Sequence, residues 1–219
     1  IMGIGAICHT VNPRLFPEQL IYIINHAEDR MIFVDLTFVP LLEAILPHCP
    51  KVERVIIMTD ADHMPKDCKL PVVDCYETLV EQGSPDVAWG DFDENTACGL
   101  CYTSGTTGNP KGVLYSHRSN FIHTLLGQQA TVMGSTPNEV ILPVVPMFHA
   151  NAWGIAFGGP AAGSKLVMPG PRMDGEAIYE LLVSEGVTFS AAVPTVWQGL
   201  LAHLREHKLK IPTVKRVLI

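Results

Sequence analysis

Short apolar runs alternate with longer amphipathic segments along this chain, and this alternation limits the folds open to it. The runs are mostly rich in β-branched residues, which predicts strands at 31–35, 54–58, 99–103, 140–145, 165–168, 187–191 and 214–219. Helical spacing predicts helices between them, at 17–29, 38–46, 117–132, 175–185 and 195–207. Polar segments at 60–69 and 83–95 predict surface loops. The predicted fold class is therefore α/β, with mostly parallel sheets flanked by helices.

The chain begins at Ile1 and ends at Ile219, each within an apolar segment. A domain rarely begins and ends in this way, so we interpret the 219 residues as part of a longer protein.

The net charge of the chain limits the kinds of partner that it can bind. The chain carries 15 Lys and Arg against 22 Asp and Glu, a formal net charge of −7 with histidine neutral. Binding to nucleic acid needs clustered basic residues, so we expect no nucleic-acid partner. Any phosphate must then be held locally, by a loop.

Six cysteines without the spacing of a disulfide framework favour a reducing, cytoplasmic setting. Residues 140–164 carry no charge, and a membrane-spanning helix is the alternative for this stretch. Its prolines and glycines instead predict a buried strand followed by a glycine-rich turn and a helix, so we expect no transmembrane segment.

The most informative segment is 102–112, which follows a predicted strand directly. Its glycines allow backbone N–H groups to turn inward, and Lys111 supplies a positive charge. Further donors are the hydroxyls of Thr103, Ser104, Thr106 and Thr107. This composition predicts a polyphosphate-binding loop. It is not a Walker A loop, because Pro110 replaces the glycine before the lysine and Gly112 follows the lysine. The alternative is a polar surface turn.

A second candidate lies at 146–153, after the predicted strand that ends at Val145. Loops at the carboxyl ends of parallel strands are where such folds bind ligands. His149 and Trp153 are four positions apart, so they face one way if the segment is helical. The alternative is that His149 is a core histidine.

Three other patterns have simpler explanations. Cys98 and Cys101 form a CxxC pair inside a predicted strand, and no second pair completes a zinc site, so we expect core cysteines. The spacing of His203, Glu206 and His207 matches an inverted zinc-protease pattern, but no acidic residue follows to complete it, which favours a solvated helix face. Residues 3–5 begin a dinucleotide fingerprint, but Cys8 replaces its third glycine.

The segment 102–112 resembles the signature of the adenylate-forming superfamily, which includes acyl-CoA synthetases, peptide-synthetase adenylation domains and luciferases. The pattern Thr-Ser-Gly-Thr-Thr-Gly-x-Pro-Lys-Gly is present at 103–112 without departure. Residues 12–15 and 23–27 are similar to fatty acyl-CoA synthetases upstream of this loop. Four further segments resemble the long- and medium-chain branch of these synthetases in particular: 115–118, 144–153, 169–174 and 193–197.

The resemblance implies a two-step reaction. A fatty acid carboxylate attacks the α-phosphate of ATP to give acyl-adenylate and diphosphate, and coenzyme A then displaces AMP. Magnesium and preorganised donors offset the repulsion between the two anions.

The resemblance also implies roles for individual residues. The phosphates would be held by Ser104, Gly105, Thr106, Thr107, Gly108 and Lys111. Thr103 is the candidate magnesium ligand. His149 would lie beside the acyl carboxylate, which makes it a catalytic candidate together with Lys111. Trp153 would gate an acyl tunnel near the nucleotide.

Other family segments are missing: a Tyr-Gly-x-Thr-Glu segment with a magnesium-binding glutamate, a ribose-binding aspartate, and a C-terminal domain with a catalytic lysine. Residues 1–219 are therefore expected to be a partial N-terminal, ATP- and acyl-binding domain that is inactive alone. The alternatives are an aryl-CoA or carrier-protein ligase and a truncated protein that binds nucleotide or acyl groups without catalysis. The resemblance also leaves open a homodimer and peripheral attachment to a membrane.

Overall fold

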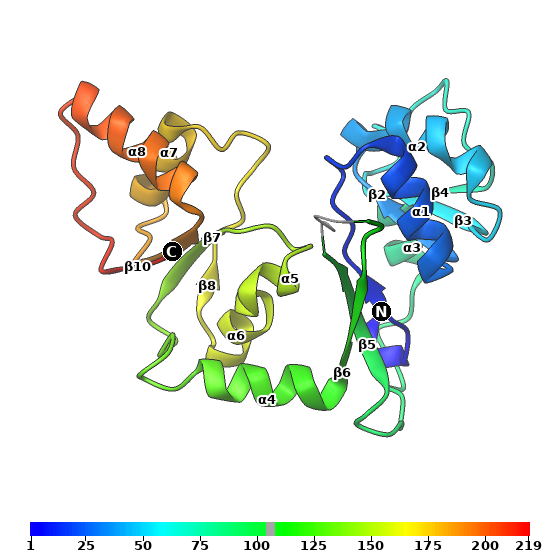
Figure 1. Cartoon of the computed structure of the whole chain (residues 1–219), viewed down its shortest axis with the longest axis horizontal. Coiled ribbons are helices and arrows are strands. Elements are labelled where there is room, and N and C mark those ends of the chain that lie inside the picture. The colour runs from blue at the N-terminus through cyan, green and yellow to red at the C-terminus, as the bar shows by residue number, and fades with distance from the viewer. Residues whose placement is uncertain (104–107) are drawn as a thin grey trace. The chain divides into compact units, whose positions relative to one another are not determined.

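The computed structural model describes residues 1–103 and 108–219 (Figure 1). It divides into two compact units, which are considered separately. Unit 1 comprises Ile1–Asp93 and Cys98–Leu114, and unit 2 comprises Glu94–Ala97 and Tyr115–Ile219.

Unit 1 contains two three-stranded sheets, with the orders β1-β5-β6 and β2-β3-β4. The strands are β1 (Cys8–His9), β2 (Met31–Val34), β3 (Arg54–Ile57), β4 (Val73–Cys75), β5 (Ala97–Tyr102) and β6 (Gly112–Ser116), the ends of the last two reaching into unit 2. The helices are α1 (Pro17–Ala27), α2 (Val39–Ile45) and α3 (Tyr76–Gln82), with short 3-10 helices at Met2–Ile4, Leu36–Phe38 and Leu46–His48.

Helix α1 shows how the sequence determines these elements. Pro17 occupies its first turn, where a missing N–H costs no hydrogen bond. Its apolar residues recur at helical spacing, and Leu20, Ile23 and Ile24 are buried. The helix ends at Glu28, whose φ of 57° lies in the left-handed region.

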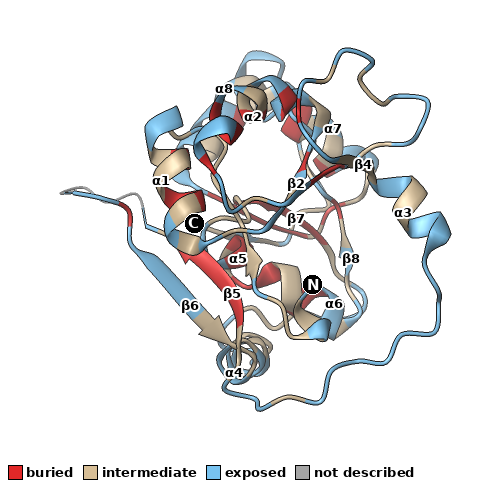
Figure 2. Ribbon diagram, turned by 90° about the vertical axis from the view of Figure 1, so that its right-hand side faces the viewer, coloured by how far each residue is buried: buried red, intermediate tan, exposed pale blue. Residues whose placement is uncertain are grey.

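Strand β5 is the central strand of its sheet, and residues 98–101 are buried. It pairs in parallel with β1, with Cys8 opposite Gly99 and His9 opposite Leu100. Its other neighbour, β6, is mostly exposed, as the contrast between the two strands in Figure 2 shows. The segment predicted to bind phosphate thus begins where a firmly held strand ends.

Unit 2 contains one four-stranded sheet of order β10-β9-β7-β8. The strands are β7 (Val140–Val144), β8 (Lys165–Leu166), β9 (Phe189–Ala192) and β10 (Arg216–Leu218). The helices are α4 (His117–Gly127), α5 (Ala150–Trp153), α6 (Ile155–Ala162), α7 (Gly175–Ser184) and α8 (Pro194–Glu206). All its recorded strand pairs are parallel.

Both faces of this sheet are buried, as is usual for parallel sheets. In β7, Leu142 belongs to a cluster with Ile178 of α7, whereas the next residue toward the N-terminus, Ile141, packs in a second cluster with Ile155 of α6. Neither β7 side chain is exposed. The apolar run of the sequence is explained by this double burial.

The predicted fold class is confirmed, and every predicted strand and helix has a counterpart. The two segments predicted as surface loops contain no helix or strand, and most of their residues are exposed. Several boundaries were wrong by two residues or more. The helices expected at 17–29 and 117–132 end at Ala27 and Gly127. The strand expected at 99–103 begins at Ala97, and the one expected at 165–168 ends at Leu166. The last two strands begin two residues later than predicted, at Phe189 and Arg216. The sequence patterns did not predict β1, β4 or α3.

Candidate functional site

The predicted phosphate-binding segment lies between β5 and β6 in unit 1, and its base is closed by main-chain contact. The N–H of Thr103 donates to the carbonyl of Lys111 at 3.0 Å. The Thr103 hydroxyl lies 3.5 Å from the same carbonyl, at the outer limit of a hydrogen bond. Both side chains are exposed, so the hydroxyl and the ammonium group are accessible to a ligand.

Gly108 and Pro110 flank the lysine side of this segment. Gly108 has a φ of 115°, which L-residues rarely adopt, and a methyl group there would meet no atom of the described residues within 4 Å. The backbone conformation alone therefore favours glycine at this position. Pro110 is buried, which anchors the chain just before Lys111. The remaining predicted phosphate-binding residues, Ser104, Gly105, Thr106 and Thr107, lie outside the described residues.

The second candidate segment lies in unit 2, where the chain leaves β7. As predicted, a buried strand is followed by a turn and a glycine-containing helix, α6. The turn itself differs from expectation. Ala150, Asn151, Ala152 and Trp153 all have positive φ, between 44° and 56°. They form one turn of left-handed helix, called the left-handed turn below.

Hydrogen bonds at helical spacing hold the left-handed turn. The N–H of Trp153 donates to the carbonyl of His149 at 3.2 Å, and that of Gly154 donates to the carbonyl of Ala150 at 3.0 Å. A left-handed helical conformation costs about 1–2 kcal/mol per non-glycine residue. Such strain is concentrated at functional sites, where the surrounding structure maintains it.

Packing offsets part of this cost. Ala152 is completely buried, and Asn151 is 5% exposed. Gly154 has a φ of 79°, and a methyl group there would lie 2.5 Å from Cε1 of His123 on α4. The α4 helix also reaches α6 through Gln128, whose side-chain amide donates to the carbonyl of Gly158 at 2.7 Å. Helix α4 therefore supports the end of the left-handed turn.

His149 and Trp153 have different environments. His149 is exposed, and its ring lies 4.9 Å from that of Phe148, so the core-histidine alternative does not hold. Trp153 is half-buried and packs against the cluster that contains Ile155 and Phe189. The role of Trp153 as a gate stays a prediction.

The structure explains the simpler patterns. Cys98 and Cys101 are buried in β5, as expected of core cysteines. All six cysteines lie in the described part and none forms a disulfide. His203 lies with its ring 4.5 Å from that of His207. Within residues 1–103 and 108–219, no cluster of three or more His, Cys, Asp or Glu side chains could hold a metal ion.

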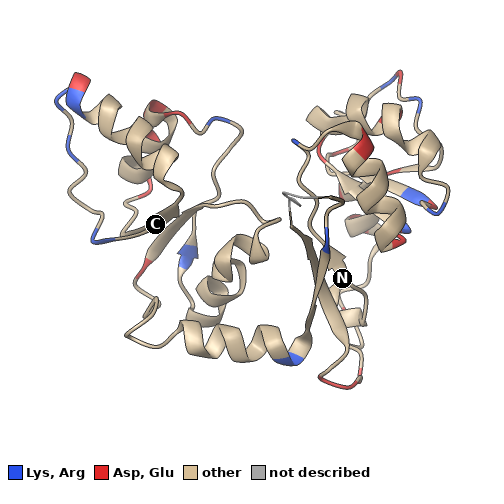
Figure 3. Ribbon diagram, in the orientation of Figure 1, with Lys and Arg blue, Asp and Glu red and all other residues tan. Residues whose placement is uncertain are grey.

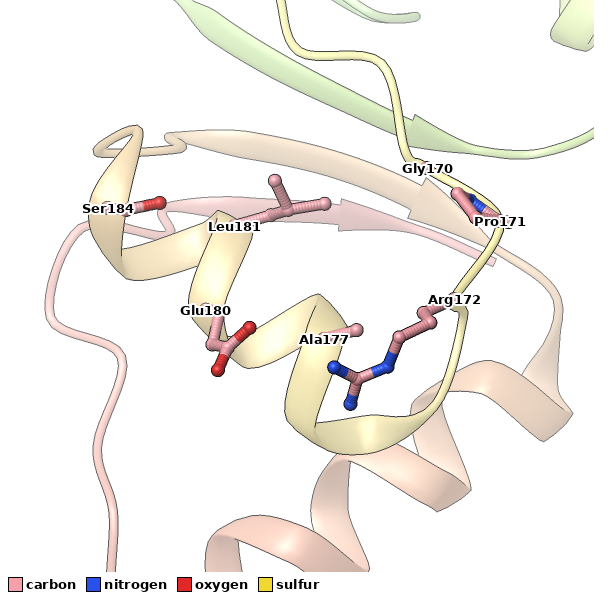
Figure 4. Close-up of a pocket in the computed structure, with 7 residues that line it drawn as sticks. All are labelled: Gly170, Pro171, Arg172, Ala177, Glu180, Leu181 and Ser184. Atoms are coloured by element: carbon pink, nitrogen blue, oxygen red, sulfur yellow. The ribbon is translucent and has the colours of Figure 1, made fainter.

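A surface hollow lies on unit 2 beside α7, but it contains none of the predicted site residues (Figure 4). Arg172, which lines it, is engaged by acidic neighbours: its guanidinium donates to Asp174 at 3.1 Å and to Glu176 at 2.9 Å. Figure 3 shows Lys and Arg distributed over both units among acidic residues. We therefore assign no site to this hollow.

Main-chain hydrogen bonds thus join Thr103 to Lys111 in unit 1 and Trp153 to His149 in unit 2. Sequence reasoning missed the left-handed turn. Its only sequence signal is Asn151, because asparagine enters the left-handed region more readily than most residues.

The family model described as AMP-binding enzyme matches residues 1–219. The chain belongs to this family. It is 48% identical over 217 residues to the 3-methylmercaptopropionyl-CoA ligase of Ruegeria lacuscaerulensis, a match that covers 99% of the chain. It is 46% identical over its whole length to the medium-chain-fatty-acid–CoA ligase of Ectopseudomonas oleovorans. The chain spans about 40% of the length of each relative.

The fold of this AMP-binding family member matches solved structures. An anthranilate CoA ligase in complex with anthranoyl-AMP superposes with a TM-score of 0.83, covering 97% of this chain and 40% of that one, at 21% identity. The expected resemblance to adenylate-forming enzymes is confirmed. In the described ranges, no helix is both long and apolar enough to cross a membrane.

Proposed function

We propose that this chain supplies the ATP- and acyl-binding part of an AMP-forming acyl-CoA ligase whose substrate is a fatty or similar aliphatic acid. The observation that carries the proposal is the closed base of the phosphate loop, within a chain that matches the AMP-binding family throughout. Two relatives that share nearly half of its residues are ligases for aliphatic acids, which favours an aliphatic substrate over an aromatic one.

In this proposal the loop acts on ATP. The Lys111 ammonium pairs with the phosphates, and backbone N–H groups around Gly108 donate to them. Donors held in place before the reaction stabilise developing charge on phosphates without reorganising, which is the role proposed for these groups. Ser104, Gly105, Thr106 and Thr107 are proposed to complete the same cradle.

Magnesium fits the groups present. Mg²⁺ usually keeps several waters and takes few protein ligands besides substrate phosphates. Thr103 offers one exposed hydroxyl whose contact with the Lys111 carbonyl is weak, so it is able to reorient toward a cation. When bound, the ion would supply positive charge that neutralises the phosphates.

The segment after β7 is proposed to act on the acid. The exposed imidazole of His149 offers a polar contact for the carboxylate, and the half-buried indole of Trp153 offers an apolar surface to the acyl chain. Coenzyme A is the proposed second substrate, and no residue of this chain is assigned to it. The six cysteines, none of which forms a disulfide, fit a cytoplasmic enzyme.

The test is ATP–diphosphate exchange by the protein translated from the complete reading frame, called the complete enzyme below. Exchange should require magnesium and should be supported by medium-chain, long-chain or short thioether acids more than by benzoate-type acids. Coenzyme A should then give the thioester. ATP binding without exchange for any acid would indicate a non-catalytic binding protein, and exchange with aromatic acids alone would indicate an aryl-CoA ligase.

A further inference from the structure

Tyr102, the last residue of β5, lies against both ends of the phosphate loop. It directly precedes Thr103, where the loop begins, and its ring covers Gly112, where the loop ends. A methyl group on Gly112 would lie 3.1 Å from Cζ of Tyr102 and 3.3 Å from its hydroxyl. The missing side chain of Gly112 therefore makes room for the tyrosine ring.

The Tyr102 hydroxyl is held by α1. Its oxygen lies 2.6 Å from Nδ1 of His26, and the two rings meet edge-on with centroids 5.9 Å apart. His26 in turn stacks on Tyr22, one turn earlier in α1, at 5.3 Å between centroids. Burial, followed by the negative charge of Asp29, raises the pKa of the Tyr102 phenol, so the hydroxyl keeps its proton at neutral pH.

A histidine from β1 lies beside the tyrosine ring. The centroid of the His9 ring is 5.2 Å from that of Tyr102. His9 is fixed by Asp29, whose carboxylate lies 2.8 Å from Nδ1, and its side chain is only 6% exposed. Tyr102 is therefore held by α1, contacted by β1 and packed on β6.

We propose that Tyr102, held by its hydrogen bond to His26, is a positioning residue for the phosphate loop. The tyrosine ring sets the spacing between the end of β5 and the start of β6. This spacing sets the direction in which Lys111 leaves the sheet. The argument rests on the proposed function of that loop in binding ATP. The contacts described for Tyr102 are with Gly112, His26 and His9. Its effect passes through the Thr103–Lys111 hydrogen bond that closes the loop.

The test compares Tyr102→Phe and His26→Ala in the complete enzyme by equilibrium binding of ATP and by diphosphate exchange. The loss of one net hydrogen bond changes an equilibrium constant by about 3- to 10-fold. Each variant should therefore raise the dissociation constant and the KM for ATP by about that factor. The KM for the acid and the melting temperature should change little. His26→Gln, which restores a hydrogen-bonding side chain, should recover part of the affinity.

Controls separate positioning from folding. Tyr76→Phe removes a hydroxyl from α3 of the same unit and should leave ATP binding unchanged. The double variant Tyr102→Phe/His26→Ala should bind ATP no more weakly than either single variant, because both remove one interaction.

Each outcome decides the assignment. Wild-type ATP affinity in both single variants would overturn it, and so would a fall in melting temperature with unchanged affinity of the folded fraction. Failure of the wild-type enzyme to bind ATP would overturn both the assignment and the proposed function. If the wild type binds ATP but activates no acid, while the two variants still weaken ATP binding, the proposed function fails and the assignment of Tyr102 stands.

Discussion

Trp153 donates its backbone N–H to the carbonyl of His149 across one turn of left-handed helix. This bond keeps the two side chains at helical spacing, as the sequence suggested, but the turn has the opposite hand from the one that an L-peptide prefers. The residues proposed to meet the acyl substrate are thus carried on a strained segment.

Relief of this strain is measurable at Ala150, which is exposed and has a φ of 44°. Ala150→Gly should stabilise the protein by about 1 kcal/mol. Glycine avoids the energy cost of the left-handed conformation, and the greater entropy of the unfolded glycine chain offsets part of this stabilisation. The matched control is Ala202→Gly in the right-handed helix α8, which should destabilise by about 0.5–1 kcal/mol. Urea unfolding of the two variants gives the comparison, and the same sign for both would contradict the strain argument.

Lys111→Ala should slow adenylation by about 10²–10³-fold, since it removes the donor that we propose binds phosphate. Diphosphate exchange by the complete enzyme isolates this step. Lys66→Ala, on an exposed loop of the same unit, is the control for losing a positive charge and should exchange normally. Normal exchange by the Lys111 variant, with failure only in thioester formation, would show that the lysine serves the second step.

Gly108→Ala tests whether the loop depends on backbone conformation. The methyl group meets no atom within 4 Å among the described residues, so the expected loss comes from the φ of 115°. We expect ATP affinity to fall by about tenfold, which corresponds to roughly 1–2 kcal/mol of backbone strain. Gly170→Ala is the control, because its methyl group also meets no atom within 4 Å and its φ is not in the left-handed region. Equal affinities for ATP in the two variants would argue against this explanation.

Trp153→Ala should make fatty-acid binding by the complete enzyme independent of ATP, because nucleotide can select a gate conformation only if the gate is present. Trp197→Ala provides the comparison. The Trp197 indole N–H donates to the carbonyl of Ala192 at 2.9 Å, and the side chain packs against a core cluster, so its loss should lower stability while ATP dependence remains. If Trp153→Ala behaves like Trp197→Ala, Trp153 is a core residue alone.

The cap of α7 should respond to acid. Asp174 accepts a hydrogen bond from the N–H of Ala177 at 3.0 Å, and this bond, followed by Arg172, lowers the pKa of the Asp174 carboxyl. An unfolded aspartate titrates near pKa 3.9. The stabilisation is thus complete above that value and lost as pH falls through the lower folded pKa.

Asp174→Asn should therefore lower the melting temperature at neutral pH, and the difference from wild type should shrink as pH falls through the lowered folded pKa of Asp174. Glu180→Gln on the same helix controls for removal of a carboxylate. A difference that persists unchanged in acid would mean that the carboxylate charge plays no part.

Local sequence patterns predicted most of the fold because the deciding interactions are local. The apolar face of α1 follows from the spacing of Leu20, Ile23 and Ile24, and the burial of β7 follows from its uninterrupted apolar run. The place of the proposed phosphate-binding segment directly after a strand was also predictable, since its glycine, hydroxyl residues and lysine follow the apolar run of β5.

The remaining features depend on contacts between distant residues. The contact of Tyr102 with His26 joins positions 76 apart, and no periodicity reports it. The left-handed turn depends on the burial of Ala152 and on the place of His123 against Gly154. Intrinsic preference alone would have made the segment at Ala150 right-handed.

The pairing of β1 with β5 has a consequence for the order of folding. Thr10 and Cys101, which follow the paired residues, are 91 positions apart, and their hydroxyl and thiol lie 3.4 Å from each other. Parallel pairing of strands so far apart in sequence is slow, because the entropy cost of closing the long loop comes before any stabilising contact forms. The β2-β3-β4 sheet, which lies between them in sequence, can form first from closer segments. The base of the proposed nucleotide loop is then completed among the last steps, so ATP binding, if it occurs there as proposed, should depend on the complete folding of this unit.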